Sequence, residues 1–141
     1  DIVTVDVSFI SILKFLDRLK AFLSPRGELL LLVKPQFEAG RRQVGKRGVV
    51  RDPEIHFSVV SEIARRAIEY GYLLFGVDYS PVTGPEGNIE FLVHLGLGGY
   101  APERTAISNG PDLEAACRRA VESAWSELAG SRRVTRVEDG G

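Results

Sequence analysis

The sequence of 141 residues has no methionine, a single cysteine and no long hydrophobic run. One cysteine, Cys117, excludes an internal disulfide and any zinc or iron–sulfur site built from several cysteines. The longest apolar stretch, Leu29 to Val33, is far shorter than the roughly 20 residues that span a bilayer. No signal-peptide pattern opens the chain, so we expect a cytoplasmic protein with no membrane partner.

The absence of methionine also bears on completeness, because a primary translation product needs an initiator. The chain begins at Asp1 and runs at once into Ile2 to Val5, which reads as a strand. We therefore expect this sequence to be a piece of a longer protein, cut at or inside a strand. A trimmed N-terminus with little lost is the alternative.

The composition that is present is ordinary for one soluble globular domain. Hydrophobic residues make up 44% and charged residues 26%, which excludes a disordered or collagen-like chain. The formal net charge is only -1, but positive charge gathers between Lys34 and Arg51, where Glu38 is the one acid. Such a basic loop on an acidic body favours an anionic partner such as a phosphate backbone, and a merely solvated loop is the alternative. The side chains that we assign to binding such a phosphate backbone, as in RNA, are Arg41, Arg42, Lys46, Arg47 and Arg51.

Hydrophobic patterning predicts an alternating order of strands and helices, typical of an α/β fold. We expect strands over residues 2–6, 28–34, 72–79 and 89–97, and helices over residues 11–23, 53–70 and 113–128. The last two strands would form an antiparallel pair, and helices would cover both faces of the sheet. A long loop over 35–51 separates the second strand from the next helix. Residues 98–111 read as a linker, and residues 130–141 are polar and expected to fray.

Two charged residues follow consecutive predicted strands. Asp6 ends the first strand and Lys34 ends the second. In sheets of this class, ligands and chemistry gather at the carboxyl ends of the strands. If the two strands pair in parallel, Asp6 and Lys34 share one rim of the sheet, and their opposite charges can meet.

Three stretches together resemble the TlyA-type ribosomal RNA 2′-O-methyltransferases, within the broader FtsJ/RrmJ-like group that is often labelled hemolysin. These stretches are DVSFIS at residues 6–11, VKPQFE at residues 33–38 and GPEGNIEFL at residues 84–92. The resemblance runs from Asp1 to about Gly99. We therefore divide the chain into residues 1–99, the C-terminal part of a methyltransferase domain, and residues 100–141, a linker, helix and polar tail without a recognisable motif.

The resemblance implies the C-terminal half of a Rossmann-like fold that uses S-adenosylmethionine. It also implies a Lys-Asp-Lys-Glu catalytic tetrad, of which the last three members fall on Asp6, Lys34 and Glu90. Asp6, Ser8 and Phe9 are the residues that we assign to the cofactor. The first lysine, the glycine-rich cofactor loop and an S4-like RNA-binding domain would lie upstream. We therefore expect this chain to be inactive alone.

These residue types suit chemistry on ribose. A 2′-hydroxyl is a poor nucleophile until its proton is removed or its developing negative charge is stabilised, and a lysine can do either. With Asp6 and Glu90 nearby, we expect Lys34 to stay protonated in the resting site, where it orients substrate and stabilises charge. Each residue also has a simpler interpretation: Asp6 as a helix cap, Lys34 as a lysine reaching solvent, and Glu90 as an exposed strand residue.

The predicted function is 2′-O-methylation of ribose in ribosomal RNA, with the RNA or a ribosomal subunit as partner and no metal. A methyltransferase acting on an amine or a base is a second possibility, although Asp6-Val7-Ser8-Phe9 lacks the Pro-Pro-aromatic motif common in such enzymes. A third is a non-catalytic module that binds RNA or another partner. A membrane-active toxin is disfavoured by the acidic residues of the last helix.

Overall fold

The computed structural model describes residues 2–98 and 105–138. Its strands are β1 (Ile2–Val5), β2 (Glu28–Val33), β3 (Leu73–Tyr79) and β4 (Phe91–Gly96). Its α-helices are α1 (Pro35–Glu38), α2 (Pro53–Glu69) and α3 (Pro111–Glu138). Short 3-10 helices lie between them: η1 (Ile12–Lys14), η2 (Leu16–Phe22), η3 (Arg41–Gln43), η4 (Lys46–Gly48) and η5 (Pro85–Gly87).

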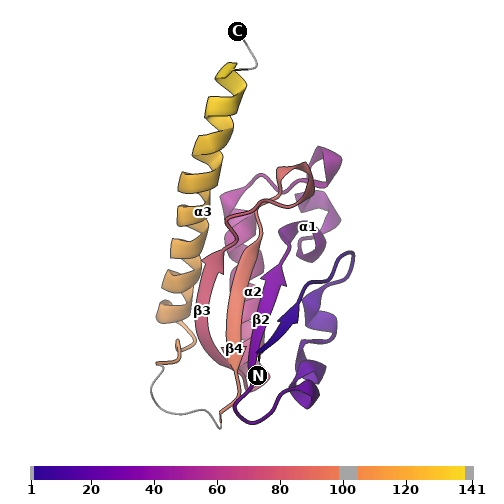
Figure 1. Cartoon of the computed structure of the whole chain (residues 1–141), viewed down its shortest axis with the longest axis vertical. Coiled ribbons are helices and arrows are strands. Elements are labelled where there is room, and N and C mark those ends of the chain that lie inside the picture. The colour runs from indigo at the N-terminus through magenta and orange to yellow at the C-terminus, as the bar shows by residue number, and fades with distance from the viewer. Residues whose placement is uncertain (1, 99–104, 139–141) are drawn as a thin grey trace.

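The strands form one sheet in the order β1-β2-β4-β3 (Figure 1). β1 pairs with β2 in parallel, and β4 runs antiparallel to both β2 and β3. This arrangement confirms the expected α/β class with parallel strands that end in an antiparallel pair. It also places the carboxyl ends of β1 and β2 at the same edge of the sheet.

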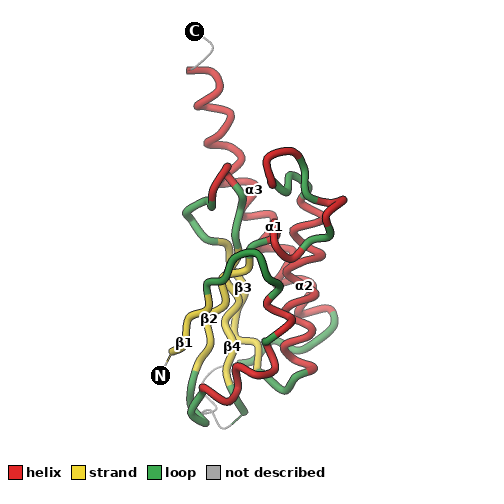
Figure 2. The backbone as a smooth tube through the Cα atoms, turned by 90° about the vertical axis from the view of Figure 1, so that its right-hand side faces the viewer, coloured by secondary structure: helices red, strands yellow, loops and turns green. Residues whose placement is uncertain are grey.

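α2 lies against one face of the sheet, behind the strands in Figure 1 and to one side of them in Figure 2, and α3 runs beside β3 at the edge of the sheet. β1, β2 and β3 run in one direction, so the crossovers between them progress across the sheet in one sense. Right-handed crossovers of one sense fall on the same face. The opposite face carries the half-buried side chains of Leu30, Leu32 and Leu92. Helices on both faces, as expected from the sequence, are therefore not found within the described residues.

Local sequence explains how α2 begins and ends. The side chain of Asp52 accepts a hydrogen bond from the amide of Glu54 at 2.9 Å, and Pro53 occupies the first helical position. Gly71, with φ of +94°, follows the last turn. The apolar face of α2, which includes Val60 and Ile63, is buried in the core.

The structure differs from the predicted helices at three places. Residues 11–23 form η1 and η2 in place of one α-helix, and the backbone leaves the helical region between them at Phe15, with φ of -135° and ψ of 1°. Glu38 accepts hydrogen bonds from the hydroxyl of Ser11 and the amide of Ile12 at the start of η1. The predicted loop after β2 begins with the short helix α1. The backbone of α3 stays helical to Glu138, beyond the point where fraying was expected. The predicted linker falls partly on residues 99–104, which lie outside the described residues.

α3 docks against α2 and β3 along one side of the sheet. The indole of Trp125 donates to Nδ1 of His56 at 2.9 Å. The guanidinium of Arg118 makes two hydrogen bonds to the Glu54 carboxylate, at 2.6 and 3.3 Å, and lies 3.8 Å from the centre of the Phe57 ring.

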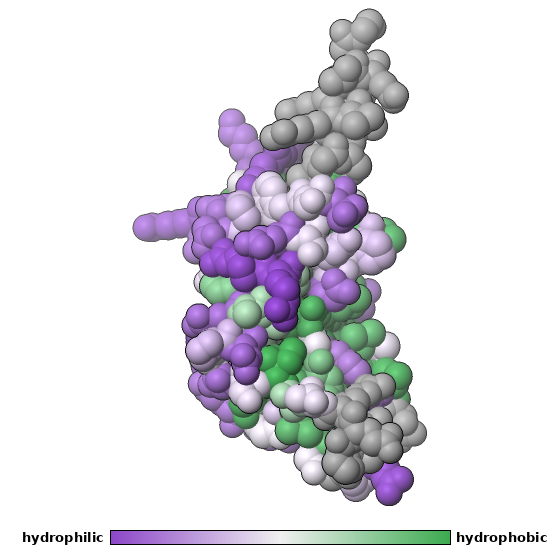
Figure 3. All heavy atoms as spheres, turned by 90° about the vertical axis from the view of Figure 1, so that its left-hand side faces the viewer, coloured by the Kyte–Doolittle hydropathy of each residue, from purple (hydrophilic) through white to green (hydrophobic). Residues whose placement is uncertain are grey.

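On the side of the molecule that carries α3, the surface is mostly hydrophilic in its upper part, with apolar residues gathered lower down (Figure 3). No described helix combines the length and apolar character that crossing a bilayer requires.

Candidate active site at the carboxyl ends of two parallel strands

Asp6 and Lys34 meet at the edge of the sheet where β1 and β2 end. The register pairs Val5 with Leu31, so the two charged residues emerge side by side. Nζ of Lys34 lies 2.5 Å from Oδ1 of Asp6 and donates to the hydroxyl of Ser8 at 3.2 Å. The predicted meeting of these opposite charges is confirmed. The Lys34 side chain is only 14% exposed against 64% for Asp6, so the lysine is the enclosed partner.

The sequence around Lys34 explains why its side chain points to β1. Pro35 has no amide hydrogen and cannot extend the strand, so it starts α1 instead. Lys34 is the N-cap of that helix, with extended backbone angles of φ -110° and ψ 98°. It therefore belongs to neither element and can turn toward the neighbouring strand end.

Glu90 lies just before β4 and is 7% exposed. Its Oε2 accepts a hydrogen bond from Nε2 of Gln36 at 3.1 Å. A Cβ at Gly84 would lie 2.5 Å from the same oxygen, so only glycine leaves room for the carboxylate there. Within the described residues, Lys34 and Glu90 form no direct ion pair. The structure brings the two to one cavity, but Gln36 is the group that binds Glu90.

A cavity of about 470 Å³ collects these side chains. Phe9 stands at its border with its side chain 88% exposed and φ of +67°, in the left-handed region that bulky residues seldom adopt. The Phe9 ring centre lies 4.9 Å from that of Phe37. The cavity is lined by residues of four segments: Ser8, Phe9, Lys34, Gln36, Phe37, Arg47, Gly48, Glu86, Asn88 and Glu90.

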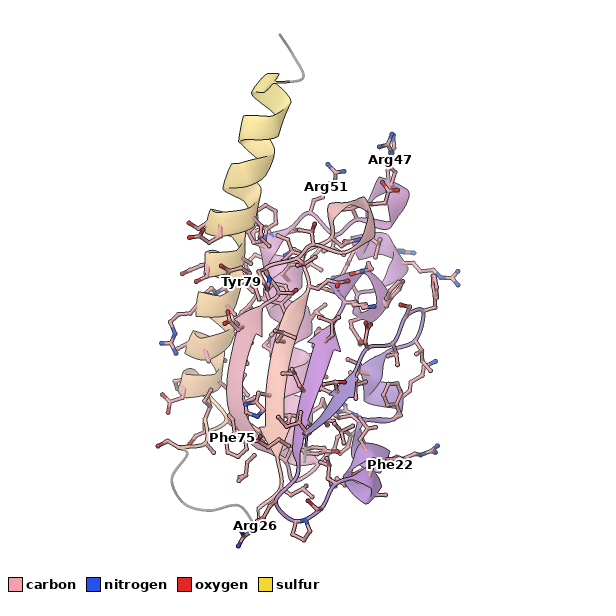
Figure 4. The ribbon with its side chains drawn as sticks, in the orientation of Figure 1. Phe22, Arg26, Arg47, Arg51, Phe75 and Tyr79 are labelled. Atoms are coloured by element: carbon pink, nitrogen blue, oxygen red, sulfur yellow. The ribbon has the colours of Figure 1, made fainter. Side chains whose placement is uncertain are left out.

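The basic segment, residues 41–51, borders this cavity. Its five predicted RNA-binding side chains, Arg41, Arg42, Lys46, Arg47 and Arg51, are all exposed. Arg47 and Arg51 point into solvent at the same end of the molecule in Figure 4. A second hollow of about 610 Å³ lies within the segment, and Arg47 lines both this hollow and the cavity beside Lys34.

Sequence reasoning assigned no site role to three residues that shape this region: Gln36, Gly84 and Asn88. The carboxamide of Asn88 accepts from the amide of Val50 at 3.1 Å and donates to the carbonyl of Gly48 at 2.9 Å. Their positions in the sequence could have pointed to them, because Gln36 lies in the 33–38 motif and Gly84 and Asn88 lie in the 84–92 motif. A single sequence does not distinguish the roles of neighbours within such a motif.

Other reactive side chains lie away from the cavity. Cys117 is buried in α3, and burial raises the pKa of its thiol to about 12. His56 packs between Phe91 and Trp125, and His94 lies 3.3 Å from Glu28. No group of three or more His, Cys, Asp and Glu residues with metal-binding geometry occurs in the part of the chain that the structure describes.

Residues 1–97 match the profile of the FtsJ-like methyltransferases. The chain belongs to the FtsJ-like methyltransferase family. The aligned region holds both the strand ends that carry Asp6 and Lys34 and the segment before β4 that carries Glu90.

Two named proteins and one solved structure are similar to this chain. The Bacillus subtilis protein named "Putative rRNA methyltransferase YqxC" is 44% identical over 125 residues, covering 89% of this chain and 43% of the relative. The 16S/23S rRNA (cytidine-2′-O)-methyltransferase TlyA of Mycobacterium tuberculosis is 41% identical over 121 residues, covering 86% and 43%. A solved structure titled "Putative hemolysin from Streptococcus thermophilus" superposes with a TM-score of 0.77 at 37% identity, covering 94% of this chain and 45% of that chain.

This FtsJ-like chain spans less than half the length of the curated relatives it matches. The parts of those relatives that have no counterpart here are therefore larger than the part that does.

Proposed function

We propose that this chain is the C-terminal part of an S-adenosylmethionine-dependent enzyme that methylates a ribose 2′-hydroxyl in ribosomal RNA in the cytoplasm. The observation that carries the proposal is the 2.5 Å contact between Lys34 and Asp6 at the carboxyl edge of the sheet. That contact lies beside a cavity that also holds Glu90, in a chain of the FtsJ-like family.

In this proposal Lys34 supplies positive charge where negative charge develops. Its ammonium group is held by Asp6 and by the hydroxyl of Ser8, which restrict its position before substrate arrives. A fixed cation near the attacking oxygen stabilises the incipient alkoxide without reorganising solvent. Glu90, fixed by Gln36, offers a carboxylate oxygen that can accept a hydrogen bond from the reacting hydroxyl.

The residues assigned to the cofactor fit part of such a group. The exposed carboxylate of Asp6 suits a cationic ligand, and the exposed ring of Phe9 offers an apolar surface for stacking. S-adenosylmethionine, when bound, supplies the methyl group. Asp6, Ser8 and Phe9 would orient it at the strand end, and Phe9 would help to exclude water there.

The basic segment would hold the RNA. Its exposed arginines and lysine lie at the same end of the molecule as the cavity, and Arg47 borders the cavity itself. Contacts to phosphates supply much of the affinity of proteins for nucleic acids and place the strand without reading its sequence. An RNA strand bound along this segment would present a ribose to Lys34.

The test is transfer of a radiolabelled methyl group from S-adenosylmethionine to ribosomal RNA from cells that lack the gene. The full-length gene product and its Lys34→Ala variant are compared. We expect labelled 2′-O-methylribose with the unaltered protein, and a loss of at least a hundredfold in the variant. The absence of transfer from folded protein with bound cofactor would contradict the proposal.

A non-catalytic RNA-binding role for this chain by itself is the second candidate. It is favoured by the match to less than half of each curated relative. We expect the 141-residue chain alone to bind S-adenosylmethionine no tighter than the millimolar range. Calorimetry that gives a micromolar dissociation constant would contradict this expectation.

A further inference from the structure

Asn88 joins two loops that both line the cavity. The residue is 3% exposed, and both ends of its carboxamide bind backbone of the basic segment. Oδ1 accepts from the amide of Val50 at 3.1 Å, and Nδ2 donates to the carbonyl of Gly48 at 2.9 Å. A turn-forming asparagine needs only local hydrogen bonds, whereas these two bridge about 40 residues of sequence.

The backbone that Asn88 binds is in a conformation that needs support. Arg47 has φ of +65° and Gly48 has φ of +70°. A left-handed conformation is unfavourable for arginine, and such conformations persist where the surrounding structure enforces them. The hydrogen bond to the Gly48 carbonyl lies directly after Arg47, so Asn88 stabilises the turn that brings Arg47 to the border of the cavity.

The other side of the connection leads to Glu90. The carbonyl of Asn88 accepts from the amide of Gly84 at 2.8 Å, which closes the loop over η5. Gly84 is also the residue whose missing side chain makes room for the Glu90 carboxylate. Within this closed loop, Glu86 adopts φ of +58° and lines the same cavity as Arg47. Asn88 therefore links the loop beside Glu90, through its backbone, to the turn that carries Arg47, through its side chain.

We infer that Asn88 is a positioning residue for the RNA substrate. Its carboxamide holds the basic segment at a fixed distance from Glu90, so that Arg47 binds a phosphate of the strand whose ribose lies in the cavity. This inference rests on the proposed function and adds to it a specific anchor for the RNA backbone next to the reacting nucleotide.

Two substitutions separate the hydrogen bonds. Asn88→Ala removes both, whereas Asn88→Asp keeps an acceptor for the Val50 amide and turns a carboxylate oxygen toward the Gly48 carbonyl. Asn109→Ala is the matched control, because Asn109 is exposed near the start of α3 and, among the residues that the structure describes, its Oδ1 accepts a local bond from the amide of Gly110 at 2.9 Å. In Figure 1 the start of α3 lies near the end of the sheet opposite the basic segment.

The first readout needs no RNA. Amide hydrogen exchange in the 141-residue chain reports on the Val50 hydrogen bond and, as a reference for the fold, on Ile63 in α2. We expect Val50 to exchange at least tenfold faster in Asn88→Ala and to remain protected in Asn88→Asp, with Ile63 unchanged in both. Unchanged protection of Val50 in Asn88→Ala would overturn the inference at its first step.

The second readout is binding of the full-length gene product to ribosomal RNA from cells that lack the gene, over a series of salt concentrations. We expect both Asn88 variants to raise the dissociation constant about tenfold and to lower the magnitude of the salt slope by about one, as loss of one phosphate contact does. KM for RNA should rise in proportion, with a smaller change in kcat. Asn109→Ala should match the unaltered protein.

A double-mutant cycle distinguishes positioning from general stability. If Asn88 acts through Arg47, adding Asn88→Ala to Arg47→Ala weakens RNA binding no further. Additive losses, or normal binding by both Asn88 variants, would overturn the positioning role while leaving the proposed function intact. Failure of the unaltered protein to bind any ribosomal RNA would instead overturn the proposed function, and the positioning role with it.

Discussion

Gln36 holds the Glu90 carboxylate, with Nε2 of the amide 3.1 Å from Oε2 of the acid. Lys34 is ion-paired with Asp6 and not with Glu90. The two acids of the site therefore have different partners: a cation binds Asp6, and a neutral amide binds Glu90. A carboxylate accepts but does not donate, which fixes the amide orientation and leaves Oε1 of Gln36 as an acceptor. That oxygen is buried and has no hydrogen-bond partner within the described part of the chain.

Gln36→Leu tests the value of this hydrogen bond, because it keeps the side-chain volume and removes the donor. A hydrogen bond to a charged group contributes about 1.5–3 kcal/mol. We therefore expect methyl transfer by the full-length gene product to fall on the order of 10- to 100-fold. Thermal unfolding of the variant should show a folded protein. Activity equal to that of the unaltered protein would mean that Glu90 needs no fixed orientation.

Gly84→Ala tests the space beside Glu90. The added Cβ would lie 2.5 Å from Oε2, so the carboxylate must move. We expect the free energy of unfolding, measured in urea, to fall by about 1–3 kcal/mol. Gly76→Ala is the control, because nothing lies within 4 Å of its Cβ position. Equal stability of the two variants would contradict the steric argument.

Trp125→Phe tests the docking of α3. The substitution keeps an aromatic ring but removes the indole N–H that donates to Nδ1 of His56. We expect a loss of about 1–2 kcal/mol in the free energy of unfolding. Ser126→Ala, at an exposed position one residue further along the helix, should change it by less than about 0.5 kcal/mol. A stability loss in both variants alike would point to the helix itself and not to the hydrogen bond.

Alkaline pH should destabilise the fold through Tyr72. Burial, with a smaller contribution from the charge of Asp17, raises the pKa of Tyr72 to about 12, from 10.0. The unfolded chain loses this proton first, so the stabilisation is complete below pH 10 and disappears as the pH rises toward 12. Urea unfolding at pH 8, 10 and 11.5 should show a steeper decline for the unaltered chain than for Tyr72→Phe. Parallel declines would contradict the assignment.

The antiparallel pairing of the last two strands and the meeting of Asp6 with Lys34 were predictable from local patterns, whereas the position of β4 between β2 and β3 was not predicted. An unbroken apolar run that ends in Lys34-Pro35 marks a strand end, and a helical segment between two strands favours a parallel pair, as β1 and β2 form. The apolar spacing of residues 11–23 was misleading, since the backbone leaves the helical region at Phe15 and Glu38 binds Ser11 and Ile12 at the start of η1 across 26 or more residues of sequence. The spacing of apolar residues along one segment does not predict contacts with a residue so distant in the sequence.

The partners of Glu90 were less predictable for the same reason. The sequence led us to expect Lys34 between Asp6 and Glu90, because opposite charges attract. In the fold, Gln36 faces Glu90 from the first turn of α1. Gly84 and Asn88 lie between the last two predicted strands, and their roles depend on contacts with side chains or backbone elsewhere. The catalytic and RNA-binding roles themselves stay predictions until the experiments above are done.

The parallel register of β1 on β2 has a consequence for changes in chain length. Asp6 and Lys34 meet because Val5 stands opposite Leu31. One residue inserted into or deleted from either strand would turn the following side chains to the other face of the sheet and part the pair. At the exposed turn of Pro25 and Arg26, an added residue leaves that register untouched. The number of residues can therefore change at this turn without loss of the site, whereas an insertion within β1 or β2 would abolish it.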